Sequence, residues 1–282
     1  MTHSVHEIPM RGGPLRLGRD ALVMGILNVT PDSFSDGGDF AARDAALAHA
    51  ELLAAEGADL LDLGGESTRP GSEEVGVQAE LDRVMPVLDG LAERGFPLPV
   101  SIDTYKALVA DQAVQAGARI INDVWGLQRD PEIADVAAHH GVPVIVMHWD
   151  TERDTARDLI AEMTRWLERS LAIAAAAGVA RDRIIIDPGF GFAKSTEENY
   201  SLLNRLDELL ALGFPLLVGT SRKRMIGNLL DVPPKDRLFG TIATSVLGYG
   251  KGGHIFRVHD VRANRDALRV AAATLYGPPS GA

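Results

Sequence analysis

The sequence of 282 residues contains no cysteine, and this absence excludes several kinds of chemistry at once. A disulfide framework, a thiolate metal site and a cysteine nucleophile are all ruled out. Basic residues are also scarce, because 28 Lys and Arg stand against 39 Asp and Glu, a formal net charge of −11. That balance disfavours nucleic acid and anionic membrane surfaces as partners. It says nothing about the charge of one local pocket.

Long hydrophobic runs are missing too. The longest uninterrupted run, Leu171–Ala180, is too short and too rich in Ala and Gly to cross a bilayer. The first ten residues lack the basic-then-apolar pattern of a secretory signal. The composition, 46% hydrophobic and 24% charged, is typical of a soluble globular protein. We therefore expect a cytoplasmic location.

Short apolar runs alternate with longer segments of helical periodicity along the whole chain. Most of the runs are continuously apolar, as expected for strands that are covered on both faces. The predicted strands are Ala21–Leu27, Asp59–Leu63, Pro99–Ile102, Arg119–Ile121, Val142–Met147, Arg183–Ile186, Pro215–Val218 and His254–Val258. The predicted helices are Ala41–Glu56, Val77–Arg94, Lys106–Gln115, Pro131–His140, Glu152–Ala177, Thr196–Leu212, Arg237–Tyr249 and Val261–Tyr276. Gly follows most of them, as a left-handed cap requires.

Eight strands alternating with eight helices favour an α/β fold, a closed (β/α)₈ TIM barrel. A doubly wound open sheet is the alternative, but it normally carries a Gly-rich turn after its first strand. Here that turn reads Asn28-Val29-Thr30-Pro31. We expect one barrel domain over residues 21–276. Residues 1–20 form an N-terminal extension, a hairpin or lid over the barrel bottom, and residues 277–282 form a disordered tail.

Polar side chains follow every predicted strand, at the end of a barrel where chemistry gathers. They include Asn28, Asp103, Asn122, Asp123, His148, Asp187, Lys223, Arg257, His259 and Asp260. An isolated Asp in such a place is more often a cap, and Asp123 and Asp260 fit that interpretation. The histidines without a partner pattern are interpreted as surface or packing residues; they are His3, His6, His49, His139, His140 and His254. Taken together, the other polar groups indicate a ligand, because they would otherwise be desolvated at a cost.

The residue types suggest what this rim binds. Asp187 with Asn122 suits the edge of a guanine-like or pterin-like ring, because a carboxylate accepts two N–H groups and an amide both donates and accepts. Lys223 is able to donate to a ring oxygen or nitrogen. Arg257 and His259 point the same way along the last strand and favour a phosphate or pyrophosphate. Asn28 offers an oxygen to Mg²⁺, which often takes only one or two protein ligands.

Two polar loops, Asn28–Phe40 and Gly64–Val75, are long for strand-to-helix connections. Loops of this kind tend to close over a substrate. Phe34, in the first loop, is either a packing residue or a lid over a ring.

These segments resemble the dihydropteroate synthases, which join a pterin to p-aminobenzoate. The resemblance spans residues 21–273 and rests on motifs in family order. The motifs are Met24–Gly38, Asp62–Gly71, Ser101–Thr104, Ile121–Val124, Asp187–Lys194, Ser221–Lys223 and Arg257–Val261. The chain departs from the family pattern at Arg224, where many relatives have Ser, and in the short connection Trp149–Thr151.

The resemblance implies a role for each site residue. The pterin would contact Asp103, Asn122, Met147, Asp187 and Lys223. The pyrophosphate would contact Asn28, Thr68, Arg69, Arg257 and His259, with Mg²⁺ on Asn28. The p-aminobenzoate would contact Phe34, Thr68, Pro70, Phe192 and Ser221. The catalytic groups would be Asp103, Lys223, Arg257 and His259, and the family also implies a homodimer with its interface on the C-terminal helices.

The implied reaction is a dissociative displacement in which pyrophosphate leaves before the arylamine attacks. Arg257, His259 and Mg²⁺ would stabilise the leaving group, and Asp103 the cation. Three alternatives remain open: a pterin-dependent methyltransferase, a Schiff-base aldolase using Lys223, and a pterin-binding paralogue without synthase activity. The predicted rim is cationic, with Arg69, Arg222, Lys223, Arg257 and His259, inside an otherwise acidic protein.

Overall fold

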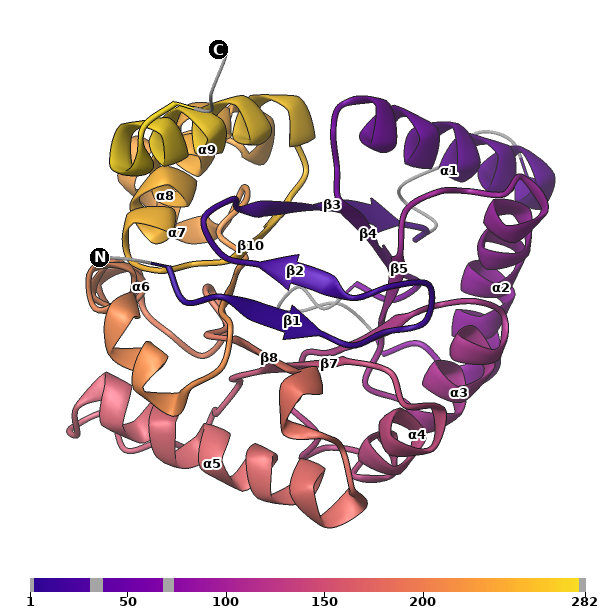
Figure 1. Ribbon diagram of the computed structural model, residues 1–282, viewed down its shortest axis with the longest axis horizontal. Helices are drawn as coiled ribbons and strands as arrows, with labels where there is room; N and C mark the ends of the chain where they lie inside the picture. The colour runs from indigo at the N-terminus through magenta and orange to yellow at the C-terminus, as the bar shows by residue number, and fades with distance from the viewer. Residues whose placement is uncertain (1–2, 31–37, 68–73, 279–282) are drawn as a thin grey trace.

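A computed structural model describes residues 3–30, 38–67 and 74–278, and its centre is a parallel barrel (Figure 1). The barrel strands are β3 (Leu22–Asn28), β4 (Leu60–Gly64), β5 (Val100–Asp103), β6 (Ile120–Asp123), β7 (Val144–Met147), β8 (Ile184–Asp187), β9 (Leu217–Val218) and β10 (Ile255–Val258). They pair in the order β8-β7-β6-β5-β4-β3-β10-β9, and an isolated parallel bridge between Ile186 and Leu216 joins the two ends. The predicted TIM-barrel fold is confirmed.

Helices surround the strands. They are α1 (Gly38–Ala55), α2 (Val77–Glu93), α3 (Ala107–Gln115), α4 (Glu132–His140), α5 (Leu159–Ala177), α6 (Thr196–Asn204), α7 (Arg224–Leu230), α8 (Leu238–Gly250) and α9 (Val261–Tyr276). Apolar side chains between the strands and this ring form the main core, for example Leu63 with Leu47 and Val84. In the described part of the chain, no helix is long and apolar enough to cross a membrane.

The structure differs from the predicted helices at two boundaries and in one additional helix. The helix expected from Glu152 begins at Leu159, because the Asp158 side chain accepts the N–H of Ala161 and caps it there. The helix expected over Thr196–Leu212 begins with a capping box at Ser195 but ends at Asn204, and a 3₁₀ segment, Leu206–Leu212, follows. The short helix α7 was not predicted.

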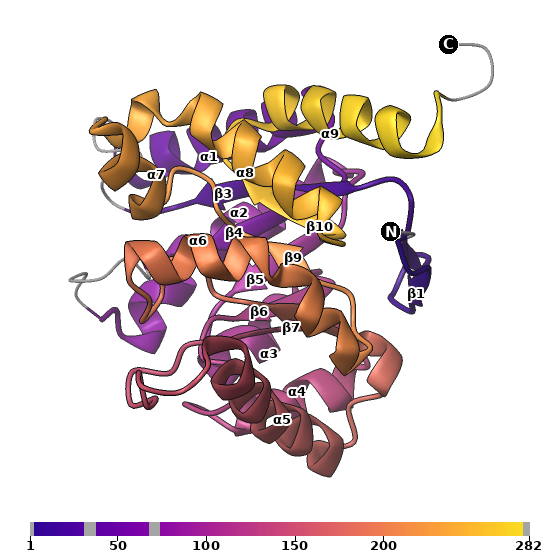
Figure 2. The same cartoon turned by 90° about the vertical axis from the view of Figure 1, so that its left-hand side faces the viewer.

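The barrel interior is apolar at the N-terminal ends of the strands, where a hairpin covers it (Figure 2). The hairpin pairs β1 (His6–Ile8) with β2 (Leu15–Leu17) in antiparallel register. Its side chains Ile8, Leu15 and Leu17 pack on an inward-facing layer. That layer contains Met24, Leu60, Ile120, Ile145, Ile185, Leu217 and Ile255. The hairpin therefore excludes water from one end of the barrel and leaves the opposite rim for a ligand.

Candidate active site

The inward-facing layer at the carboxyl ends of the strands is polar. Successive inward positions on a strand are two residues apart. The polar layer lies two residues beyond the apolar layer that the hairpin covers. It contains Asp62, Asn122, Met147, Asp187 and Arg257. Asn28 and Asp103 end β3 and β5 at the same rim. The strand period therefore places groups from distant parts of the chain in one layer above the sealed end.

The half-buried guanidinium of Arg257 joins two buried carboxylates at the centre of this rim. Nε of Arg257 donates to Oδ2 of Asp62 at 2.6 Å, and Nη2 donates to Oδ2 of Asp103 at 2.8 Å. The Asn122 amide donates to the same Asp62 oxygen at 3.1 Å. Asp62 is fully buried. This pairing orients Asn122 and Arg257 toward the barrel axis.

Sequence reasoning missed Asp62 as a site residue, although the residue lies inside one of the family motifs. The available signal was its position, since a charged residue at an inward position of the apolar run Leu60–Gly64 has to find a partner. That partner, Arg257, is 195 residues away in the chain.

Asp103 lies in a strongly perturbed environment. Burial raises the pKa of its carboxyl group well above the ordinary value, and the neighbouring Asp62 carboxylate adds to this, while Arg257 acts in the opposite direction. Among the described residues, Oδ1 of Asp103 and Oδ1 of Asp62 are buried without a hydrogen-bond partner. Buried acceptors of this kind are suited to ligand N–H groups.

Asp187 is a second buried carboxylate on the rim. Its Oδ1 accepts the N–H of Gly189 at 2.7 Å. Burial raises the pKa of Asp187, whereas Gly189, Lys223 and Arg257 oppose that shift. Gly189 has a φ of 70°, and a Cβ at this position would lie 2.0 Å from the carbonyl oxygen of His148. Only glycine fits this turn, which presents its N–H to Asp187.

Lys223 lies over an aromatic wall. Its Nζ is 4.1 Å from the centre of the Phe192 ring, within the range of a cation–π contact. The Phe192 ring packs on Trp149 at 4.8 Å, and Trp149 stacks on Trp125 at 4.0 Å. Met147 belongs to the same cluster, so the predicted ring contacts Met147 and Phe192 do lie together.

Two further predicted residues, Ser221 and His259, contact each other. The Ser221 Oγ and His259 Nδ1 are 2.9 Å apart, and the same Oγ accepts the His259 N–H at 3.1 Å. Next to them, Arg222 donates two hydrogen bonds to Asp260, at 2.7 and 3.1 Å. Two cations of the predicted rim, Arg222 and Arg257, are therefore balanced by carboxylates in the structure.

Asn28 is half-buried, and its Oδ1 faces the Asp103 side chain across Gly64. A Cβ on Gly64 would lie 3.3 Å from Oδ1 of Asn28 and 3.5 Å from Cβ of Asp103. In the described ranges, no group of three or more His, Asp or Glu residues is arranged to hold a metal ion. The donor set therefore fits only a hard cation that takes most of its ligands from water and substrate, which is how Mg²⁺ usually binds.

Several other interpretations are now decided. Asp123 is a turn cap, because its carboxylate accepts the N–H groups of Trp125 and Leu127. His254 is a buried packing residue that hydrogen-bonds to Ser4. Four predicted site residues lie outside the described residues; they are Phe34, Thr68, Arg69 and Pro70.

The chain matches the family model described as "Pterin binding enzyme" over residues 24–259. It is 50% identical to the dihydropteroate synthase of Bacillus subtilis over 93% of this chain and 90% of that protein. The Escherichia coli K12 enzyme is 47% identical over 90% of this chain and 91% of its own length.

Solved structures agree with these matches. Dihydropteroate synthase from Xanthomonas albilineans with 4-aminobenzoic acid superposes with a TM-score of 0.91 at 46% identity, covering 98% of this chain and 100% of that one. The Clostridium difficile enzyme in the presence of pteroic acid superposes with a TM-score of 0.89 at 47% identity, covering 92% and 98%. With this fold, this rim and these similarities, the chain belongs to the dihydropteroate synthases, the pterin-binding transferases of folate biosynthesis.

Proposed function

We propose that the rim binds 6-hydroxymethyl-7,8-dihydropterin pyrophosphate and p-aminobenzoate, and that its residues divide the work of joining them. The observation that carries this assignment is the shared guanidinium of Arg257, held between the buried carboxylates of Asp62 and Asp103. Buried charges of this kind require partners, and the oxygens left over are available to a polar ring.

The pterin is recognised through its hydrogen-bonding edge. Asp187 accepts from the amidine-like N–H groups, Asn122 donates and accepts, and Lys223 donates to a ring oxygen or nitrogen. Met147, which is buried next to Phe192, packs against the ring face. The Asp103 carboxylate lies beside the reacting side of the ring.

Departure of the pyrophosphate breaks the C–O bond at the pterin CH₂ group, and the leaving group takes the electron pair. Arg257 has five N–H donors, and its two ion pairs engage Nε and Nη2, so donors remain for an anion. His259, which Ser221 orients, lies at the same rim. Arg257 and Lys223 favour the ionised form of Asp103 against the effect of its burial, and in that form the carboxylate stabilises the cation left on the pterin.

The arylamine nitrogen then donates its lone pair to the CH₂ carbon and loses a proton to solvent. No covalent enzyme intermediate is needed, because positioning supplies much of the acceleration. Phe192 and Ser221 contribute to the p-aminobenzoate side, and Phe34, Thr68 and Pro70 are proposed to complete it. Arg224, exposed at the start of α7, is the departure from the family pattern on this side.

Mg²⁺ is proposed as the metal, held by Asn28. When bound, it neutralises charge on the pyrophosphate. The protein supplies a single amide oxygen for it, so its affinity in the absence of the substrate is expected to be low.

The family's homodimer is proposed for this protein as well. The faces of α8 and α9 carry exposed apolar side chains, among them Phe239, Leu247, Val270 and Leu275. A hollow of about 530 Å³ lies between the two helices, lined by residues such as Val246 and Ala271. Apolar surface of this extent is typical of an interface. The cytoplasmic location expected from the sequence stays a prediction.

One assay tests the proposed function. Purified protein is incubated with dihydropterin pyrophosphate and MgCl₂, with and without p-aminobenzoate, and both pyrophosphate and dihydropteroate are measured. We expect dihydropteroate only with both substrates, and its formation should stop when EDTA removes the metal. An absence of dihydropteroate with both substrates and Mg²⁺ present would contradict the proposal.

A further inference from the structure

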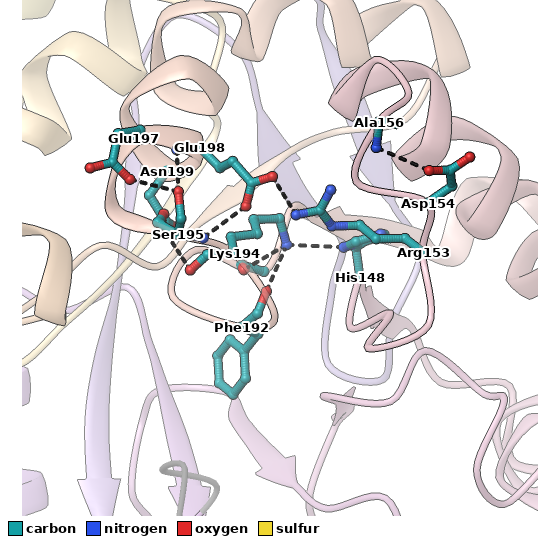
Figure 3. A network of polar contacts seen from close by, with 11 residues as sticks. His148, Arg153, Asp154, Ala156, Phe192, Lys194, Ser195, Glu197, Glu198 and Asn199 are labelled. Atoms are coloured by element: carbon teal, nitrogen blue, oxygen red, sulfur yellow. Dashed lines mark hydrogen bonds and ion pairs between the residues drawn. The ribbon is translucent and has the colours of Figure 1, made fainter.

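The half-buried side chain of Lys194 joins two loops of the rim through its ammonium group, and no role was predicted for it (Figure 3). It follows β8 at the end of the motif Asp187–Lys194. Its Nζ donates to the carbonyl oxygens of Gly189 at 3.0 Å and Phe192 at 3.1 Å. It also lies 3.0 Å from Nδ1 of His148, at the end of β7. The ammonium thus has three acceptors within the protein.

The two carbonyls belong to residues that control the pterin side of the site. Gly189 donates its N–H to Asp187, and the Phe192 ring lies under the ammonium of Lys223. Lys194 therefore positions both groups proposed to bind the pterin edge. It holds the acceptor Asp187 through Gly189, and it holds the donor Lys223 through Phe192.

The loop that follows β8, from Gly189 to Ala193, has a backbone conformation that its residues do not all favour by themselves. Gly189, Gly191 and Ala193 all have a positive φ, and Ala193, at 47°, carries a Cβ in the left-handed region. A non-glycine residue is disfavoured there, because its Cβ crowds the backbone in the left-handed region. The ties from Lys194 compensate for that cost and select this loop conformation.

The neighbours of Lys194 and its burial act on the charge of the amine in opposite directions. Burial holds the pKa of His148 down at about 2, so the ring stays neutral and its Nδ1 accepts. Burial also lowers the pKa of Lys194 to about 7, against the attraction of Asp187 and Glu198. Arg153 pairs with Glu198, whose other carboxylate oxygen accepts the N–H of Ser195 in the capping box of α6 (Figure 3). The start of α6 thus holds the Glu198 carboxylate, whose negative charge attracts the Lys194 ammonium.

We propose that Lys194 is a positioning residue for pterin binding, which ties the β8 loop so that Asp187 and Lys223 meet the ring in register. This inference rests on the proposed function, because it assigns Lys194 a task in the same site. Arg257, His259 and Asp103 come from other strands and keep their places without it. Loss of Lys194 should therefore weaken pterin binding more than it slows the chemical step.

The test compares Lys194→Met, which removes the ammonium and keeps most of the chain length, with Lys251→Met as a matched control. Lys251 follows α8 at the opposite end of the barrel and pairs with Asp207. We expect Lys194→Met to raise the KM for dihydropterin pyrophosphate roughly 10-fold or more, with a smaller fall in kcat. Lys194→Arg, which keeps the charge and the donors, should recover part of the affinity, and Lys251→Met should behave as the wild type.

Tryptophan fluorescence gives a measurement that does not depend on activity. The three tryptophans lie next to this network: Trp149 and Trp125 behind Phe192, and Trp166 with its ring centre 5.0 Å from that of His148. Lys194→Met should change the emission spectrum and the quenching by acrylamide, whereas Lys251→Met should change neither.

The outcomes separate the two proposals. If KM and emission of Lys194→Met match those of the control, the positioning role is overturned. If the wild type forms no product, the proposed function fails, and the emission alone decides whether Lys194 holds the loop. If Lys194→Met does not fold, the KM and the emission of Lys194→Gln are compared with those of Lys251→Met instead, because Gln keeps N–H donors at this position.

Discussion

Asp62 and Arg257 form an ion pair at the rim, with 2.6 Å between Oδ2 and Nε and with the carboxylate fully buried. Burying this carboxylate costs desolvation energy, and the attraction to the Arg257 guanidinium offsets that cost. Arg257 also pairs with Asp103, with 2.8 Å between Nη2 and Oδ2. The pair thus sets the charge balance of the site before any substrate arrives.

Asp62→Asn should impair both activity and stability, because the Asp62 carboxylate holds the Arg257 guanidinium in place. Removing one partner leaves the Arg257 charge uncompensated on that side, at a cost of about 3–5 kcal/mol in the free energy of unfolding. We expect kcat/KM to fall at least about 100-fold, since Arg257 then pairs more closely with Asp103. Urea unfolding and steady-state kinetics measure both effects. The matched control, Asp89→Asn on the exposed face of α2, should leave both unchanged; wild-type kinetics in Asp62→Asn would count against the role of the pair.

Asp103→Asn and Asp187→Ala should fail in different ways. Asp103→Asn keeps the shape but removes the charge opposite the developing cation, so kcat should fall roughly 100-fold or more while pterin binding persists. Asp187→Ala removes the acceptor for the ring edge and should abolish binding. Calorimetric titration with a pterin analogue, together with turnover rates, distinguishes the two. Equal turnover in Asp103→Asn, or retained affinity in Asp187→Ala, would be inconsistent with the respective assignment.

Stability should fall on acidification because of His254, which is 1% exposed under the N-terminal hairpin. Its Nδ1 accepts the N–H of Leu216, and its Nε2 donates to the carbonyl oxygen of Ser4, a pattern that only the neutral ring satisfies. Burial lowers the pKa of His254 from 6.5 to about 4, and the nearby His6 and His3 act in the same direction.

The sign of this effect follows from proton binding. Between pH 6.5 and about 4 the unfolded chain binds the proton and the folded protein does not, so stability is present above this window and is lost as the pH falls through it. The contribution of His254 is at most about 3 kcal/mol. Urea unfolding at a series of pH values measures it, and His254→Gln should flatten the dependence. A variant with the full wild-type slope would show that other groups cause it.

Gly189→Ala should disrupt the rim, because the added methyl group would lie 2.0 Å from the backbone oxygen of His148 and the backbone is in the left-handed region. We expect a destabilisation of about 2 kcal/mol or more and a loss of pterin affinity, since the N–H that fixes Asp187 moves. Gly250→Ala is the matched control. A Cβ there meets nothing within 4 Å, and α8 should be unchanged or slightly stabilised. Thermal unfolding of both variants checks this, and an equal effect at the two positions would contradict the steric argument.

The sequence by itself determined the alternation of strands and helices, the rim and the family. Buried parallel strands such as Ile184–Asp187 are continuously apolar up to a polar end, and that local pattern survives in any context. The motifs then identified Asn122, Asp187, Lys223 and Arg257 as neighbours at one rim, because all eight strands of a barrel point the same way.

Only the tertiary structure decided which charges pair and where several helices begin. Asp62 meets Arg257 across 195 residues, and Lys194 meets His148 across 46, so no local pattern contains either contact. The start of α5 was decided by which of several acidic residues caps it, since Asp150 and Asp154 bind backbone N–H groups of their own turns. The physical reason is common to all three. The energy of a buried charge or a cap depends on the partner it finds in space, whereas hydrophobic periodicity depends only on neighbours along the chain.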